Sequence, residues 1–209
     1  LSLQGDGGIF RSADIRVEGC RILAVEPGLR PEAGETVIDA GGKLILPGLV
    51  NAHYHSYGNL LKGTSWGEPL EIWAQDTIAL GGRMDEAMMR LSAALGIVEM
   101  LRSGVTCCLD HIPHPGAVDA IAGEYERCGF RAAVAPMISD VSDAQILPGM
   151  PEAEAAAGRR IERAPALEPE AVTARYDAWA ARWHREDGTL RLLAGLNAPQ
   201  RASDRALQT

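Results

Sequence analysis

From residue 48 onward, stretches typical of buried strands alternate with stretches typical of helices. Strand patterns occupy residues 48–55, 105–111, 130–139 and 189–199, and helical patterns occupy 69–80, 84–104, 116–129 and 168–187. The strands are apolar without a period of two, which is typical of parallel strands covered on both faces. A doubly wound sheet and a (β/α) barrel both fit this alternation. No Gly-rich phosphate fingerprint follows the first strand, which counts against a dinucleotide-binding fold.

The stretch 84–104 gives the clearest helical pattern. Its large apolar residues recur at helical spacing along one stripe, formed by Met88, Leu91, Leu95, Val98 and Leu101. Asp85 is placed to cap the N-terminus, and Gly104 is placed to end the helix.

The first 47 residues contain short β patterns instead. Residues 13–19 and 20–28 predict a hairpin that turns at Gly19 and Cys20, and residues 35–48 predict a second pair that turns at Gly41 and Gly42. Strands this short need a partner sheet. We therefore expect residues 1–47 to form part of a small β-sandwich, and residues 48–209 to form a separate α/β unit. A long Ala- and Pro-rich insertion at 140–167 would follow the third strand of that unit.

Composition excludes several classes of function. The net charge of −8 argues against a nucleic-acid groove and against a polybasic membrane contact. No apolar run approaches the roughly 18 to 20 residues of a membrane span. The four cysteines, at positions 20, 107, 108 and 128, have neither zinc-knuckle spacing nor the density of a disulfide framework, so we expect reduced thiols in a cytoplasmic protein. Because the chain begins at Leu1 and not at Met, we also expect further sequence upstream.

The stretch LPGLVNAHYH, residues 46–55, carries the chemistry. Residues i and i+2 of a strand lie on the same face, so His53 and His55 point the same way. Two neutral imidazoles so arranged can bind a metal such as zinc or iron. A hydrogen-bonded pair with a structural role is the alternative.

The residues around this pair resemble the amidohydrolase superfamily. ILPGLVNAHYH resembles the point where a β-sandwich strand of that family leads into barrel strand one, and VIDAGGK precedes it in the same way. LRSGVTCCLDH is similar to its second barrel strand, and LNAPQRASDRAL to its fourth strand and the following helix. The branch that the chain most resembles contains chlorohydrolases and the cytosine, guanine and adenosylhomocysteine deaminases.

The resemblance implies that the unit is the N-terminal half of a (β/α)8 TIM-type barrel, with His53 and His55 as the first two metal ligands. A complete barrel needs about 250 residues, so the family's other metal ligands and its acid–base residues would lie beyond Thr209, and catalytic residues stay unknown. Some relatives bridge two metals with a carboxylated lysine on strand four, but this chain has only Lys43 and Lys62. The expected cofactor is therefore one divalent ion, Zn²⁺ first and Fe²⁺ as the alternative.

Four residues are candidates for substrate contact. Trp66 and His111 lie after or at the ends of strands one and two, and Asn197 and Gln200 lie at the end of strand four. The alternative for each of the four is a packing residue or a polar loop residue that has no contact with substrate. We expect Asp110 to anchor a loop or the backbone and not to take part in catalysis.

These features predict a metal-dependent hydrolase acting on C–N bonds other than peptide bonds. Its reaction would be hydrolytic deamination or dechlorination of an N-heterocycle such as a purine, pyrimidine or triazine. A cyclic-amide hydrolase of the imidazolonepropionase type, or a catalytically incomplete fragment, is the alternative. The 209-residue chain alone should be inactive. An open barrel leaves an unpaired strand edge, so we also expect a homo-oligomer, with no nucleic-acid or membrane partner.

Overall fold

The computed structural model describes residues 12–141, 168–186 and 188–207. The chain divides into two compact units, Leu1–Gly48 and Leu49–Thr209. Most of the insertion expected at 140–167 lies outside the described residues. None of the helices in the described part of the chain has the length and apolar character needed to cross a bilayer.

The described residues of the first unit, 12–48, contain one β-hairpin. β1 (Asp14–Glu18) pairs antiparallel with β2 (Arg21–Glu26), and Gly19 turns between them with φ of +57°. The hairpin prediction is confirmed. The second predicted pair is wrong, because residues 35–48 form no strand and retain only a turn in which Lys43 N donates to Ala40 O at 2.9 Å. Val37, Ile38 and Leu44 are exposed there, so within residues 12–48 no partner sheet covers these apolar side chains and holds a strand pair.

The second unit is built on a parallel sheet. Its strands follow the order β3 (Leu49–Tyr54), β4 (Val105–Ile112), β5 (Arg131–Ile138) and β6 (Leu190–Leu192). The short strand β7 (Gly195–Leu196) also pairs with β5. All pairings in this sheet are parallel, as the alternation predicts. The single strand predicted at 189–199 is instead broken between Leu192 and Gly195 into two pieces.

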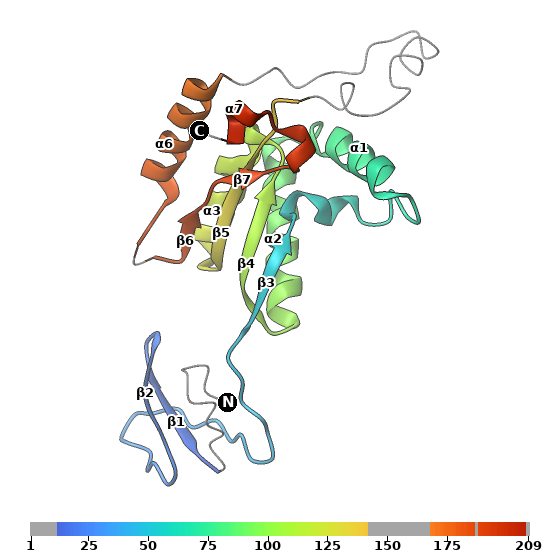
Figure 1. Cartoon of the computed structure of the whole chain (residues 1–209). Coiled ribbons are helices and arrows are strands. Elements are labelled where there is room, and N and C mark those ends of the chain that lie inside the picture. The colour runs from blue at the N-terminus through green and yellow to red at the C-terminus, as the bar shows by residue number, and fades with distance from the viewer. Residues whose placement is uncertain (1–11, 142–167, 187, 208–209) are drawn as a thin grey trace, which may run out of the picture. The chain divides into compact units, whose positions relative to one another are not determined.

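In the described residues of this unit, the helices are those that the sequence predicts, with short additions. They are α1 (Leu70–Gly81), α2 (Glu86–Arg102), α3 (Val118–Cys128), α6 (Pro169–Trp183) and α7 (Asp204–Leu207). Three 3₁₀ turns, η1 (Ser56–Leu61), η2 (Pro115–Ala117) and η3 (Pro199–Arg201), follow strand ends. In Figure 1, α2 and α3 lie on the same face of the sheet, and α2 contacts β4 while α3 contacts β5.

The two faces of the sheet differ in burial. On β4, Cys108, Asp110 and Ile112 are buried on the helix side, whereas Cys107, Leu109 and His111 on the other side are only partly buried. The core therefore lies between sheet and helices. The expectation of strands covered on both faces is not met, because in a half-barrel the inward face stays open.

Helix α2 begins and ends where the sequence predicts. The Asp85 side chain accepts a hydrogen bond from Met88 N at 2.8 Å, and Gly104 follows the helix with φ of +77°. The face that α2 buries combines three large side chains with three small residues, and consists of Met89, Ser92, Ala93, Gly96, Ile97 and Met100. The stripe of large apolar residues that marks the helix is 41–54% exposed, and consists of Met88, Leu91, Leu95, Val98 and Leu101.

Candidate metal centre

Three histidine rings meet at the C-terminal ends of two adjacent strands. His53 lies in β3, His55 follows its last residue, and His111 is the penultimate residue of β4. The His53 ring centroid lies 4.9 Å from that of His55 and 5.1 Å from that of His111, and the His55 and His111 centroids are 6.0 Å apart. Parallel neighbours end at the same edge of a sheet, which explains why residues 56 positions apart come together.

One hydrogen bond defines which nitrogen of His55 is available. Nδ1 of His55 lies 2.8 Å from the backbone carbonyl oxygen of His111. A carbonyl only accepts, so Nδ1 must carry the proton, and Nε2 of the neutral ring keeps its lone pair. This is the arrangement in which a histidine serves as a metal ligand, with its other nitrogen held by the protein.

His111 is held in its neutral form. Burial lowers the pKa of its imidazole, and the nearby His53 and His55 lower it further. At neutral pH His111 therefore offers an uncharged ring, the form of imidazole that suits zinc and iron.

The described residues fit only part of a metal's coordination shell. Within them, no group of three or more His, Cys, Asp or Glu side chains is arranged to hold a metal ion. A tetrahedral zinc site needs four ligands. His53 and His55 could thus supply two, and the others would come from elsewhere.

The turn after His55 is fixed by polar contacts to two other elements, β4 and α2. Ser56 N donates to Oδ1 of Asp110 in β4 at 2.9 Å. Oγ of Ser92 in α2 donates to Ser56 O at 2.7 Å, and Nδ2 of Asn59 lies 2.9 Å from Ser92 O. These bonds leave the His55 backbone little freedom, as a preorganised ligand requires.

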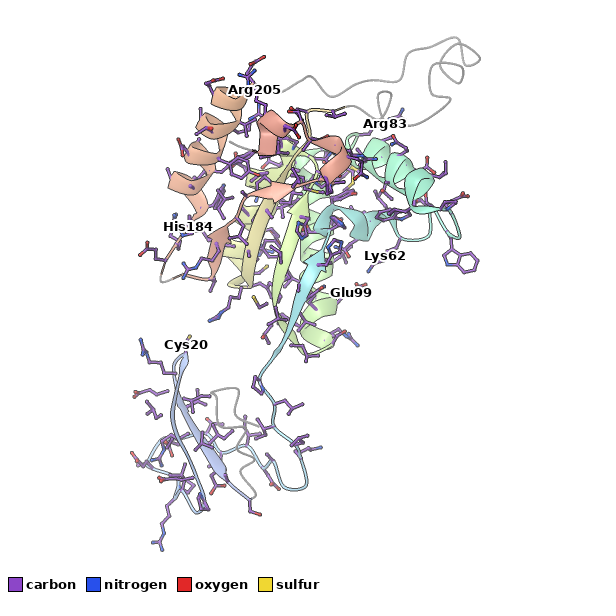
Figure 2. All side chains as sticks on the ribbon, viewed as in Figure 1. Cys20, Lys62, Arg83, Glu99, His184 and Arg205 are labelled. Atoms are coloured by element: carbon purple, nitrogen blue, oxygen red, sulfur yellow. The ribbon has the colours of Figure 1, made fainter. Side chains whose placement is uncertain are left out.

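Neither lysine of the chain belongs to a described strand of the sheet that carries the histidines. Lys62 forms an ion pair with Glu99 of α2, and both are labelled side by side in Figure 2. Lys43 belongs to the first unit, and no residue of β6 or β7 is a lysine. This is consistent with the predicted single-metal centre, which the structure does not test.

Of the predicted substrate-contact residues, only His111 joins the cluster. The Trp66 side chain is 91% exposed, and among the described aromatic residues no ring contact links it to the histidines. Asn197 N donates to Ile138 O at 3.1 Å, and its Oδ1 lies 3.5 Å from an Arg201 guanidinium nitrogen. Gln200 is exposed in η3. These three roles stay predictions.

Sequence reasoning missed most of the supporting residues. The sequence shows no motif at Ser92, Asn59 or Tyr125. A polar serine within the apolar pattern of 84–104 was nevertheless a usable signal for a buried hydrogen bond. The anchoring role expected of Asp110 agrees with its hydrogen bond to Ser56 N. Cys108, two residues before Asp110 on the same face of β4, is buried, which raises the pKa of its thiol to about 12 and keeps it protonated.

The amidohydrolase family model matches residues 44–199, which is most of the chain and includes all three clustered histidines. The chain belongs to the amidohydrolase family. The resemblance drawn from the histidine motif is therefore confirmed.

Curated relatives include several deaminases. The chain is 37% identical over 136 residues to 5-methylthioadenosine/S-adenosylhomocysteine deaminase 2 of Archaeoglobus fulgidus, covering 65% of this chain and 32% of that protein. It is 34% identical over 141 residues to 5'-deoxyadenosine deaminase of Methanothermobacter thermautotrophicus, covering 67% and 32%. The matches thus span about a third of the length of these relatives.

Solved structures confirm the fold class, the N-terminal half of a TIM-type barrel. A mutant of atrazine chlorohydrolase from Arthrobacter aurescens, complexed with zinc and atraton, superposes with a TM-score of 0.77 at 18% identity, covering 93% of this chain and 44% of that one. A zinc-bound adenosine deaminase from Xanthomonas campestris gives 0.68 at 24% identity, covering 97% and 42%.

Proposed function

We propose that this chain carries the first part of the metal centre of a hydrolase that deaminates or dechlorinates an N-heterocycle. The observation that supports it is the cluster of His53, His55 and His111, in which the bond from His55 Nδ1 to the His111 carbonyl leaves Nε2 free. Family membership fixes the kind of chemistry to be considered.

His53 and His55 would hold one divalent ion, Zn²⁺ first and Fe²⁺ as the alternative. Bound there, the ion would supply a hydroxide at neutral pH by lowering the pKa of a water. The protein's own part is to present Nε2 of His55 in a fixed orientation through the His111 carbonyl and the Ser56 turn. The neutral ring of His111 is placed beside the ligands, where it can contact a substrate.

The proposed substrate is a flat, aminated or halogenated ring such as a purine, pyrimidine or triazine. Support comes from the relatives, which are named as deaminases of adenosine derivatives, and from structural neighbours named as a triazine-type chlorohydrolase and an adenosine deaminase. Deamination is the first choice, because the two curated relatives named above, at 37% and 34% identity, are named as deaminases. Trp66, Asn197 and Gln200 remain proposed contacts of this ring.

Three further properties are proposed for the chain itself. Because it supplies only His53 and His55 as proposed ligands, the 209-residue chain should bind metal weakly and show no turnover. The four cysteines are free thiols, which suits the reducing cytoplasm. The open edge of β3 and the exposed stripe on α2 support self-association into a homo-oligomer.

An ammonia-release assay tests the proposed function. A longer protein containing this chain and the remaining barrel should release ammonia from an aminated purine, pyrimidine or triazine. The variant carrying His53→Ala and His55→Ala should lose at least 100-fold in rate, since a zinc site rarely survives the loss of two ligands. Inert aminated rings together with opening of a cyclic amide would favour the cyclic-amide hydrolase, and an unaffected double variant would refute the metal assignment.

A further inference from the structure

Asp110 is a buried carboxylate, and burying a charged group is energetically unfavourable. Its side chain is fully buried on the helix side of β4. Among the described residues no lysine or arginine forms an ion pair with it. Transfer of an unpaired carboxylate from water into the protein interior costs roughly several kcal/mol, unless other groups compensate for the lost hydration. The fold therefore keeps a destabilising group at this position.

Two donors converge on this carboxylate. Oδ1 accepts from Ser56 N at 2.9 Å, and Oδ2 accepts from the Tyr125 hydroxyl at 2.9 Å. Tyr125 is itself buried in α3. An ionised carboxylate only accepts, so its two oxygens match the two donors, whereas an amide would turn an NH₂ group toward one of them.

The position of Asp110 connects it to the histidine cluster. In the sheet register Asp110 lies opposite Tyr54, between His53 and His55 in sequence, and it bonds the residue directly after His55. It also directly precedes His111, whose carbonyl holds Nδ1 of His55. The Asp110 side chain thus holds Ser56, the residue that follows His55, and Asp110 itself directly precedes His111. Both backbone segments that meet at the His55–His111 hydrogen bond are therefore held near it.

The charge balance agrees with this geometry. Burial raises the pKa of the Asp110 carboxyl, while the hydrogen bonds from Ser56 and Tyr125 and the nearby His55 oppose that rise. A cation held by the histidines would further offset the buried negative charge, because attraction between charges is strong where water is excluded.

We propose that Asp110 is a positioning residue of the metal centre, which holds the turn after β3 so that Nε2 of His55 points at the ion. This inference rests on the proposed function, which assigns His53 and His55 as ligands. Asp110 touches neither metal nor substrate in this role. It acts through Ser56 and through the orientation of the His55 ring.

Zinc titration of the 209-residue protein and its variants tests the inference. Asp110→Ala should weaken Zn²⁺ binding by about 10- to 100-fold, the usual effect of removing a residue that orients a ligand. Asp110→Asn should weaken it less, since one oxygen can still accept from Ser56 N. Tyr125→Phe should have the smallest effect, because it removes only the donor to Oδ2.

A matched control separates positioning from stability. Glu124 is another buried carboxylate, bound to Arg127 on the same helix as Tyr125, and Glu124→Gln should lower stability without changing Zn²⁺ affinity. Nitrogen-15 NMR of the His55 ring adds a direct readout, because Asp110→Asn should mix the two tautomers and Glu124→Gln should not. If Asp110→Ala fails to fold, Asp110→Asn and Tyr125→Phe carry the test.

Two results would overturn the inference in distinguishable ways. If the Asp110 variants bind Zn²⁺ as tightly as wild type while the His53→Ala, His55→Ala protein does not, Asp110 has no positioning role and the metal assignment stands. If the double histidine variant binds as tightly as wild type, the proposed metal centre is itself wrong and the inference fails with it.

Discussion

The histidines of this chain show how environment decides the chemistry of one residue type. His55 has one nitrogen bonded to a backbone carbonyl and the other free, which suits metal binding. His114 lies only three residues beyond His111, but its Nε2 is buried with no hydrogen-bond partner among the described residues. It packs against the Tyr57 ring at 5.0 Å between centroids, and against Gly81, where an added Cβ would lie 2.5 Å from Nε2. The sequence spacing of these histidines did not distinguish the two environments.

His114 should make stability depend on pH. Burial lowers the pKa of His114 below its ordinary 6.5, so as pH falls below that value the unfolded chain binds the proton first and the folded state loses stability. The loss can reach about 1.4 kcal/mol per pH unit for one proton. Urea unfolding between pH 7 and 5 should show a shallower decline for His114→Gln than for wild type. The two proteins share all other titrating groups, so equal slopes would contradict the prediction.

At the scale of elements, the sequence predicted well which segments form helices and strands, but it predicted poorly which face of an element is buried. Helix α2 was predicted from its apolar stripe and its caps, and both ends agree. Which face it buries depends on what packs against it, and the buried face uses small residues such as Ala93 and Gly96 that allow close approach. Whether residues 35–48 pair as strands, and where the strand predicted at 189–199 is interrupted, likewise depends on the partner strands. Local sequence patterns do not reveal those partners.

Gly96 offers a test of that close approach. A Cβ built there would lie 1.6 Å from the Tyr54 hydroxyl and 2.6 Å from Asn59 Nδ2, so both side chains would have to move and their hydrogen bond to each other would be disturbed. Gly96→Ala should destabilise the protein by about 1–3 kcal/mol, although alanine favours helices. Gly123→Ala in α3 is the control, since its nearest neighbour is the flexible end of Arg90 at 3.3 Å. Urea unfolding measures both, and a Gly96→Ala protein as stable as wild type would refute the packing argument.

For the whole molecule, the sequence established the family and the first two candidate ligands, because a short motif carries both. It could not supply the network that supports them. Asp110 bonds a residue 54 positions away, and Ser92 one that is 36 away, and contacts of that range depend on the assembled fold. Among the described residues no group of three or more His, Cys, Asp or Glu side chains is arranged to hold a metal ion, so the motif supplies two candidate ligands and not the rest of the proposed metal shell.

The unit formed by Leu49–Thr209 should self-associate. β3 stands at one end of the strand order, with Leu49 and Val50 exposed, and α2 exposes the stripe that includes Leu91 and Leu95. An unpaired strand edge invites pairing with another chain, and burying one leucine contributes about 1.5–3 kcal/mol.

Sedimentation of the 209-residue protein should therefore show dimers or larger species at micromolar concentration. Leu91→Glu with Leu95→Glu should shift the population toward monomer, because the two charges resist burial in an interface. Ala178→Glu with Ala181→Glu adds the same charge to an exposed part of α6 and should leave association unchanged. A monodisperse wild-type monomer would show that the exposed stripe and the β3 edge do not drive association, and equal association of the two double variants would place the interface on another face of the unit.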